Sequence, residues 1–218
     1  MLQCRTAALV CALSVVLAGC SIFGDGSTGR PSSGLKTASL TAAYVPLESH
    51  ELMIVEHWGA GVVVAPHVAV TNAHNFNLIP PDAILAVSKD YDLLFFHTDK
   101  AVPVPTAEAR PGQAIIAYGQ GSKEDLREAD GAVRAVDVRV AARCSQCREQ
   151  RAITYDADAG PGFSGGPLVE AKTGMVVGLT FGYRDREGLN GARLMFAYSI
   201  ETVVAEMHRL LGPDGPKT

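Results

Sequence analysis

The stretch Gly162-Phe163-Ser164-Gly165-Gly166-Pro167 is the pattern that decides the fold class of this 218-residue chain. A serine hydroxyl is a poor nucleophile until a base removes its proton and hydrogen-bond donors stabilise the oxyanion. Gly162 lets the backbone turn so that its own N–H and that of Ser164 point into one pocket. Gly165 and Gly166 leave room for a substrate. The alternative is a glycine-rich turn with a passive serine, so a base must be sought elsewhere in the chain.

A candidate base follows an apolar strand. Val68-Ala69-Val70 leads through the small-residue turn Thr71-Asn72-Ala73 to His74, and a second apolar run, Gly59-Ala60-Gly61-Val62-Val63-Val64, comes before it. A lone histidine is more often structural than catalytic. Its position after two successive strands favours a general base.

A candidate partner for His74 lies in Asp90-Tyr91-Asp92-Leu93-Leu94-Phe95-Phe96. A carboxylate just before a hydrophobic strand can be held buried and directed at imidazole Nδ1, where it fixes the tautomer and stabilises the imidazolium. Asp92 has this position. Asp90 is the fallback and otherwise a solvated turn residue.

These three patterns together resemble the chymotrypsin-like and trypsin-like serine proteases. Gly162 to Pro167 matches their G-x-S-G-G-P signature, and Thr71 to His74 matches T-x-A-H. Asp92 matches D-[IL]-A, with Leu94 in place of the alanine. The resemblance implies that Ser164 attacks a peptide carbonyl, His74 moves the proton and Asp92 orients His74. It also implies that the amides of Gly162 and Ser164 bind the oxyanion, with no metal and no cofactor.

Two further features resemble bacterial HtrA-type protease domains. These are the glycine-containing strand pair before His74 and the segment Met195-Phe196-Ala197-Tyr198 before a terminal helix. The PDZ domain that is common in HtrA-type proteases is not expected after this helix. The implied fold is all-β, with two six-stranded-type antiparallel barrels and a C-terminal α-helix. The spacing from His74 to Asp92 is short for this family, which indicates a reduced first barrel. Phe163 stands where trypsin-like enzymes have an aspartate that pairs with a new N-terminal amine, so we expect no activation of that kind.

The hydrophobic pattern agrees with an all-β domain. Short runs rich in β-branched or aromatic residues alternate with Gly, Pro, Asn and Asp. A helix is expected over Ile200–Leu211, because Ser199 can cap it and its apolar residues recur at helical spacing. The predicted strands are Leu52–Glu56, Gly61–Val64, Val68–Thr71, Ile84–Val87, Leu93–His97, Ala114–Tyr118, Gly131–Ala142, Gly166–Glu170, Met175–Phe181 and Leu194–Tyr198.

Substrate preference is weakly signalled. Asp158 precedes Ser164 by the spacing that places an aspartate at the base of the trypsin specificity pocket, which would favour Arg or Lys. The alternative is an exposed loop acid, because the T-D-A segment of HtrA-type enzymes better matches Tyr155-Asp156-Ala157. The other pocket wall is expected at Thr180-Phe181-Gly182, where an extended protein or peptide substrate could pair with a strand edge.

The N-terminus predicts a lipoprotein of the bacterial cell envelope. Arg5 precedes a short apolar run that ends in Leu17-Ala18-Gly19-Cys20, which resembles the lipobox. Cleavage before Cys20 and acylation of this residue would anchor the chain in a membrane. Ser21, rather than Asp, after the cysteine favours the outer membrane. The alternative is an ordinary signal peptide that contains a cysteine.

Composition completes the predicted organisation. The domains expected are a signal peptide (1–19), a lipidated flexible tether (20–39), the protease domain (40–212) and a tail (213–218). A net charge of −4 argues against a nucleic-acid partner. Cys144 and Cys147 are too few for a structural zinc site, and in an oxidising periplasm they favour a local disulfide over two free thiols.

Two other interpretations stay open. Gly162 to Gly166 also fits the nucleophile elbow of α/β-hydrolases, in which Ser164, Asp185 and His208 would form the triad. That elbow requires a helix directly after the serine, and Gly165-Gly166-Pro167 is a poor helix start. The second alternative is an inactive, lipid-anchored binding domain with the protease fold, suggested by the reduced first barrel.

Overall fold

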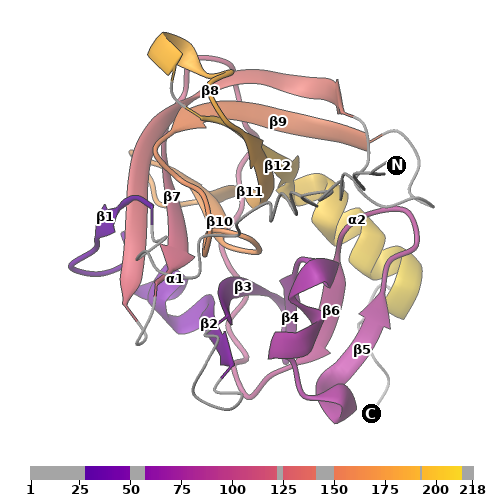
Figure 1. Cartoon of the computed structure of the whole chain (residues 1–218). Helices are drawn as coiled ribbons and strands as arrows, with labels where there is room; N and C mark the ends of the chain where they lie inside the picture. Colours follow the sequence, from indigo (N-terminus) through magenta and orange to yellow (C-terminus); the bar gives the residue numbers. More distant parts are fainter. Residues whose placement is uncertain (1–27, 50–56, 122–124, 141–149, 192, 213–218) are drawn as a thin grey trace, which may run out of the picture.

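The computed structural model describes residues 28–49, 57–121, 125–140, 150–191 and 193–212, and in them the chain forms two antiparallel sheets and a C-terminal helix (Figure 1). The first sheet has the strand order β2 (Tyr44–Ser49), β3 (His57–Ala65), β4 (Val68–Thr71), β6 (Leu94–His97), β5 (Ile84–Val87). The second has the order β1 (Arg30–Pro31), β8 (Leu126–Val140), β7 (Ala114–Gln120), β10 (Pro167–Glu170), β11 (Val176–Arg184), β12 (Leu194–Ser199), β9 (Gln150–Ala157). The predicted all-β fold with a C-terminal helix is confirmed.

The second sheet is a closed barrel, because β8 pairs with β7 on one side and with β9 on the other. Alternate residues of its strands point inward and pack together, as the pleat requires. The fully or nearly fully buried residues of this interior include Ile115, Ala117, Tyr155, Leu168, Val177 and Met195. The barrel therefore supplies a rigid frame for the turn that carries Ser164.

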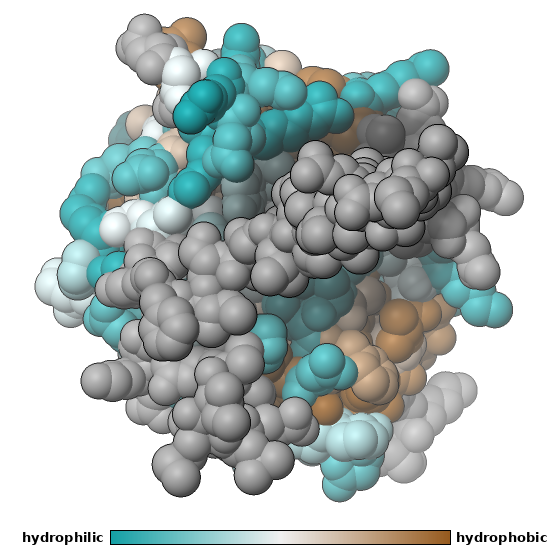
Figure 2. Space-filling model, in the orientation of Figure 1, coloured by the Kyte–Doolittle hydropathy of each residue, from teal (hydrophilic) through white to brown (hydrophobic). Residues whose placement is uncertain are grey.

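The first sheet is smaller. It contains five strands in the described part of the chain, with β2 and β5 at its two edges, in agreement with the reduction expected from the short His74–Asp92 spacing. The residues of β5 are only partly buried, and Figure 2 shows hydrophobic surface at the lower right, on the side where Figure 1 places β5.

Helix α2 (Ile200–Leu211) has the predicted bounds and contacts β11 and β12 of the second sheet and β5 of the first. The Ser199 hydroxyl accepts the Thr202 N–H at 3.2 Å, which caps the helix as expected. Val203 and Met207 belong to the same apolar cluster as the strands of the first sheet. The helix thus joins the two halves of the molecule.

The N-terminal part of the domain differs from the prediction. Residues 28–39, expected to be tether, belong to the fold: β1 pairs with β8, and α1 (Ala38–Ala43) begins at its cap Thr37. Arg30 forms ion pairs with Glu128 and Asp130 on β8. Backbone pairing and these ion pairs hold the segment in the fold although it has few large apolar residues. Leu40, which follows the segment, is fully buried in the core.

The other differences concern strands and short helices. β2 and β9 were not predicted, and neither were the 3-10 helices η2 (Ala73–Leu78), η3 (Pro81–Ala83) and η5 (Leu189–Gly191). The strand predicted at 52–56 lies outside the described residues. β4, β5 and α2 have the predicted bounds.

Candidate active site

His74 lies in η2, directly after the fully buried strand β4. The turn between them is held by Asn72, whose side-chain amide donates to the backbone carbonyl of Asp92 at 3.0 Å. The imidazole itself is about half exposed, with 47% of its side-chain surface accessible. The histidine therefore follows a buried strand and lies at the surface of a cleft.

Asp92 meets His74 at two points. Oδ2 lies 2.6 Å from His74 Nδ1, and Oδ1 accepts the backbone N–H of His74 at 3.0 Å. This pairing places the proton on Nδ1 and leaves Nε2 as the basic nitrogen. Asp90 is not part of this contact: its carboxylate lies 3.5 Å from the Arg209 guanidinium instead.

Ser164 lies on the turn between β9 and β10, and its backbone is bonded to the first sheet. The Ser164 carbonyl accepts the N–H of Ala60 at 3.0 Å and the side-chain amide of Asn75 at 3.1 Å. Asn75 is the neighbour of His74, so the nucleophile turn and the histidine turn share a fixed contact. In the described part of the chain no hydrogen bond joins the Ser164 hydroxyl to His74, although both line one cleft.

The turn before Ser164 requires glycine. Gly162 has a φ of +88°, and a Cβ there would lie 2.0 Å from the Gln120 carbonyl oxygen. The Gly162 carbonyl accepts the Gln120 N–H at 2.9 Å, and the Phe163 N–H donates to the Gly160 carbonyl at 3.1 Å. Within the described residues the amides of Gly162 and Ser164 have no acceptor, so both remain able to bind an oxyanion.

Phe163 is fully buried in the interior of the second barrel. Its ring lies against two glycines: a Cβ on Gly29 would meet Phe163 Cζ at 2.8 Å, and one on Gly119 would meet Cγ at 2.7 Å. Apolar packing and close contact with Gly29 and Gly119 therefore hold the Phe163 ring in place.

The cleft has a volume of about 450 Å³ and aromatic walls. Of the predicted substrate-binding residues, Phe181 and Gly182 line it, whereas Thr180 is buried and its hydroxyl lies 2.7 Å from that of Tyr155. Asp158 is exposed and is not among the lining residues. The lining residues are His74, Asp92, Gln150, Gly160, Pro161, Ser164, Phe181, Gly182, Tyr183 and Tyr198.

Five residues that line the cleft were missed by the sequence analysis, namely Gln150, Gly160, Pro161, Tyr183 and Tyr198. The Tyr198 hydroxyl accepts the backbone N–H of Asp92 at 3.1 Å, and these residues are 106 positions apart in the chain. No local pattern reveals such a pair. Tyr198 does belong to the segment that resembles the HtrA-type terminus, which is the one signal the sequence contains.

The α/β-hydrolase interpretation is wrong. The fold is all-β, and Asp185 accepts a hydrogen bond from Arg193 Nε at 2.9 Å rather than facing a histidine. His208 is exposed on α2 and lines a different pocket from the one that Ser164 lines. Cys20, Cys144 and Cys147 lie outside the described residues, so the predicted lipidation and disulfide stay predictions.

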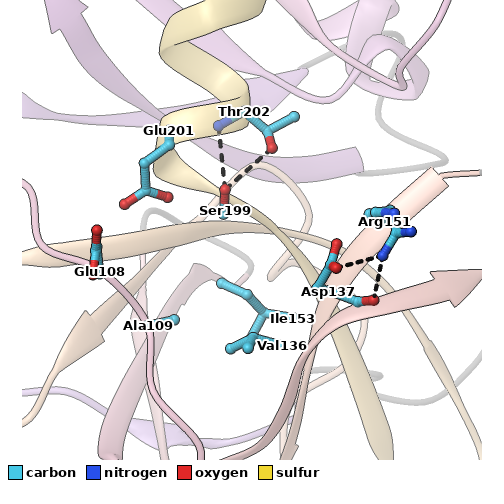
Figure 3. Close-up of a pocket in the computed structure, with 9 residues that line it drawn as sticks. All are labelled: Glu108, Ala109, Val136, Asp137, Arg151, Ile153, Ser199, Glu201 and Thr202. Carbon is cyan, nitrogen blue, oxygen red and sulfur yellow. Dashed lines mark hydrogen bonds and ion pairs between the residues drawn. The ribbon is translucent and has the colours of Figure 1, made fainter.

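A second pocket, of about 260 Å³, lies at the start of α2 (Figure 3). Asp137 from β8 and Arg151 from β9 form an ion pair at its rim. Glu108 and Glu201 flank it, and the Ser199 cap forms part of its wall. None of its lining residues lines the cleft of His74 and Ser164, so the two hollows are separate.

Two searches of the described residues gave negative results. They contain no cluster of three or more His, Cys, Asp or Glu side chains suited to a metal ion. They also contain no helix with the length and apolar content needed to cross a bilayer.

Comparison with known proteins supports the fold. A family model described as a trypsin-like peptidase domain matches residues 77–179, a segment that contains Asp92 and Ser164 and begins just after His74. No curated protein sequence matches the chain. Several solved protease structures resemble it at low sequence identity.

The Rv3671c protease from M. tuberculosis, active form, is 18% identical, with a TM-score of 0.64 over 84% of this chain and 88% of that one. Deg5 is 22% identical, with a TM-score of 0.60 over 81% and 92%. A variant of the HtrA-type protease AlgW with a tripeptide is 17% identical, with a TM-score of 0.62 over 80% and 62%. The chain thus has the chymotrypsin-like fold.

Proposed function

We propose that this protein is a serine endopeptidase that hydrolyses peptide bonds through an acyl-enzyme, with Ser164, His74 and Asp92 as its triad. The observation that carries the proposal is the two-point contact of Asp92 with His74 in the cleft that Ser164 lines. A trypsin-like fold supports serine protease chemistry in general. Neither a metal nor a cofactor is needed for it.

The geometry suggests how each group acts. Because Asp92 holds the Nδ1 proton, His74 Nε2 can take the proton of the Ser164 hydroxyl as this attacks the carbonyl carbon. The free amides of Gly162 and Ser164 stabilise the oxyanion. His74 then protonates the leaving amine, and water hydrolyses the acyl-enzyme by the same path in reverse.

The proposal is tested by labelling the full-length protein with a fluorophosphonate probe, which reacts only with an activated serine. The wild type should be labelled, while Ser164→Ala and His74→Ala should not. Ser33→Ala, which removes an exposed serine hydroxyl distant from Ser164 in the sequence, is the matched control and should be labelled like the wild type. A folded wild type that stays unlabelled would contradict the proposal.

The second candidate is an inactive binding domain with the same fold. The missing hydrogen bond between Ser164 and His74 favours it, although such bonds are often long before substrate binds. The labelling experiment decides between the two, because a binding domain gives no Ser164-dependent product.

We also propose that Cys20 is lipidated and anchors the protein in the bacterial outer membrane. The support is the sequence Leu17-Ala18-Gly19-Cys20, followed by Ser21. Labelled palmitate should enter the wild type and not Cys20→Ala, and globomycin should cause the uncleaved precursor to accumulate. Palmitate that persists in Cys20→Ala would refute this anchor.

A further inference from the structure

The turn that carries Asp92 belongs to the reduced first sheet, but residues of the second sheet also hold it. Within the turn, the backbone N–H groups of Asp90 and Tyr91 donate to Ser88 Oγ at 3.1 and 3.0 Å. The Ser88 N–H also donates to the Leu93 carbonyl at 2.9 Å, and the Asp92 carbonyl accepts from the Asn72 side chain at 3.0 Å. The Asp92 N–H and the Asp90 carbonyl both reach residues of the second barrel.

Tyr198, on β12, supplies the first of these contacts. Its hydroxyl accepts the Asp92 N–H at 3.1 Å and donates to Gln150 Oε1 at 2.6 Å. The ring is fully buried and fixed by stacking on Phe181, with 4.2 Å between centroids, and by an edge contact with Tyr91 at 5.6 Å. Burial raises the pKa of the Tyr198 hydroxyl, which keeps it protonated and able to donate.

Gln150, at the start of β9, supplies the second contact. Its Nε2 donates to the Asp90 carbonyl at 3.0 Å while its Oε1 accepts from Tyr198. The side chain is buried, with 4% of the residue exposed. The oxygen and the nitrogen of the side-chain amide therefore both form hydrogen bonds. A continuous chain of hydrogen bonds runs from the Asp90 carbonyl through Gln150 and Tyr198 to the Asp92 N–H.

The terminal helix holds the other side of the turn. Ser88 donates to the buried carboxylate of Glu206, which also accepts from Arg209 Nε at 2.7 Å and Nη2 at 2.6 Å. Arg209 in turn faces Asp90 at 3.5 Å. The turn that contains Asp90 and Asp92 is thus held by hydrogen bonds to the second barrel on one side and by contacts with α2 on the other.

We infer that Tyr198 and Gln150 are positioning residues for Asp92, joining the second barrel to the catalytic carboxylate of the first sheet; this rests on the proposed function. The reason is that both carboxylate oxygens of Asp92 already contact His74. The orientation of this carboxylate therefore depends on how the Asp92 backbone is held. That backbone is held at the carbonyl by Asn72 and at the N–H by Tyr198.

The decisive variant is Tyr198→Phe in the full-length protein, which keeps the stacked ring and removes only the hydroxyl. Because small misplacements of catalytic groups are costly, kcat should fall about tenfold while KM changes less than about twofold. The matched control is Tyr44→Phe, which removes a buried hydroxyl that donates to Gln120 rather than to the Asp92 turn. It should keep the wild-type kcat.

A positioning role makes a second demand that a merely structural role does not. In an Asp92→Ala background, Tyr198→Phe should lower the rate of fluorophosphonate labelling no further, because the residue it positions is gone. An equal loss in both backgrounds, or a Tyr198→Phe kcat within twofold of wild type, would overturn the inference. An unlabelled wild type would instead refute the proposed function, so the two failures are distinguishable.

Gln150→Met provides an independent variant of similar shape. It should lower kcat in the same way, and the double variant with Tyr198→Phe should be little worse than Gln150→Met alone, because both lie on one path. Fully additive losses would contradict that path. Urea unfolding of each variant reports whether it is folded at the assay temperature.

Discussion

Glu206 is the buried acid through which the terminal helix contacts the turn before Asp92, and its replacement gives a quantitative test of that contact. With 4% of its surface exposed, the carboxylate accepts hydrogen bonds from Ser88 and from two nitrogens of Arg209. Glu206→Gln keeps the shape but removes the charge. One carboxylate oxygen becomes an amide group that cannot accept.

The expected loss of stability follows from these bonds. A hydrogen bond to a charged group contributes about 1.5–3 kcal/mol, and this range applies to the buried contact with Ser88. Arg209 is half exposed, so solvent screens its ion pair with Glu206 and this pair adds little to the stability. The expected loss is therefore about 1.5–3 kcal/mol, which lowers the urea midpoint by about 1 M for a domain of this size.

The effect should depend on pH with a definite sign. Burial alone would raise the pKa of Glu206, but the hydrogen bonds from Arg209 and Ser88 outweigh it, so the pKa is lowered. A lowered pKa in the folded state means stability that is complete above the unfolded value of about 4.3 and lost as the pH falls through the folded value. The gap between wild type and Glu206→Gln should therefore be full at neutral pH and shrink below about pH 4.3.

The assay is urea unfolding followed by tryptophan fluorescence at several pH values. Glu201→Gln is the matched control, since Glu201 is exposed in the first turn of the same helix and should shift the midpoint only slightly. If the two variants had equal midpoints at neutral pH, or if the gap for Glu206→Gln were the same at every pH, the assignment of a buried, charge-assisted contact would be refuted.

Three further predictions concern other parts of the molecule. Gly29→Val should destabilise the domain and lower kcat, because φ is +72° and a Cβ would meet the Glu128 carbonyl at 2.7 Å and the Phe163 ring at 2.8 Å; urea unfolding and peptide hydrolysis measure both. Asp158→Ala should leave the preference for residues before the scissile bond unchanged, since Asp158 is exposed outside the cleft; a peptide library that lost Arg and Lys cleavage would contradict this. Leu40→Ala should cost about 2–5 kcal/mol in thermal or urea unfolding, because the fully buried side chain leaves a cavity.

The sequence predicted the strands and the helix where local signals were strong. Two strands bounded by turn residues, Val68–Thr71 and Ile84–Val87, and the capped amphipathic helix Ile200–Leu211 have the bounds expected. β9 was missed although its residues are mostly buried, because a two-sided buried strand has no polar alternation. The order of residues 28–39 was missed because it comes from pairing with β8, a distant partner.

The same distinction applies to the candidate site. His74, Asp92 and Ser164 each lie in a short pattern that combines a strand end with small residues, so local sequence identifies them. The residues that position Asp92 are one tyrosine and one glutamine, Tyr198 and Gln150. Their neighbours in the chain form no motif that would indicate this role. Hydrogen bonds between residues far apart in sequence become apparent only when the two sheets are placed together.

The contacts across the two sheets are reciprocal, and this has a mechanical consequence. Ser164, carried by the second barrel, has its carbonyl bonded to Ala60 and Asn75 of the first half, while Asp92, carried by the first sheet, has its N–H bonded to Tyr198 of the second. Any shift of one sheet against the other must therefore stretch both sets of bonds together. Both sets of bonds therefore oppose a displacement of Ser164 relative to Asp92, and the contact with Tyr198 helps a shortened first sheet to hold Asp92 in place.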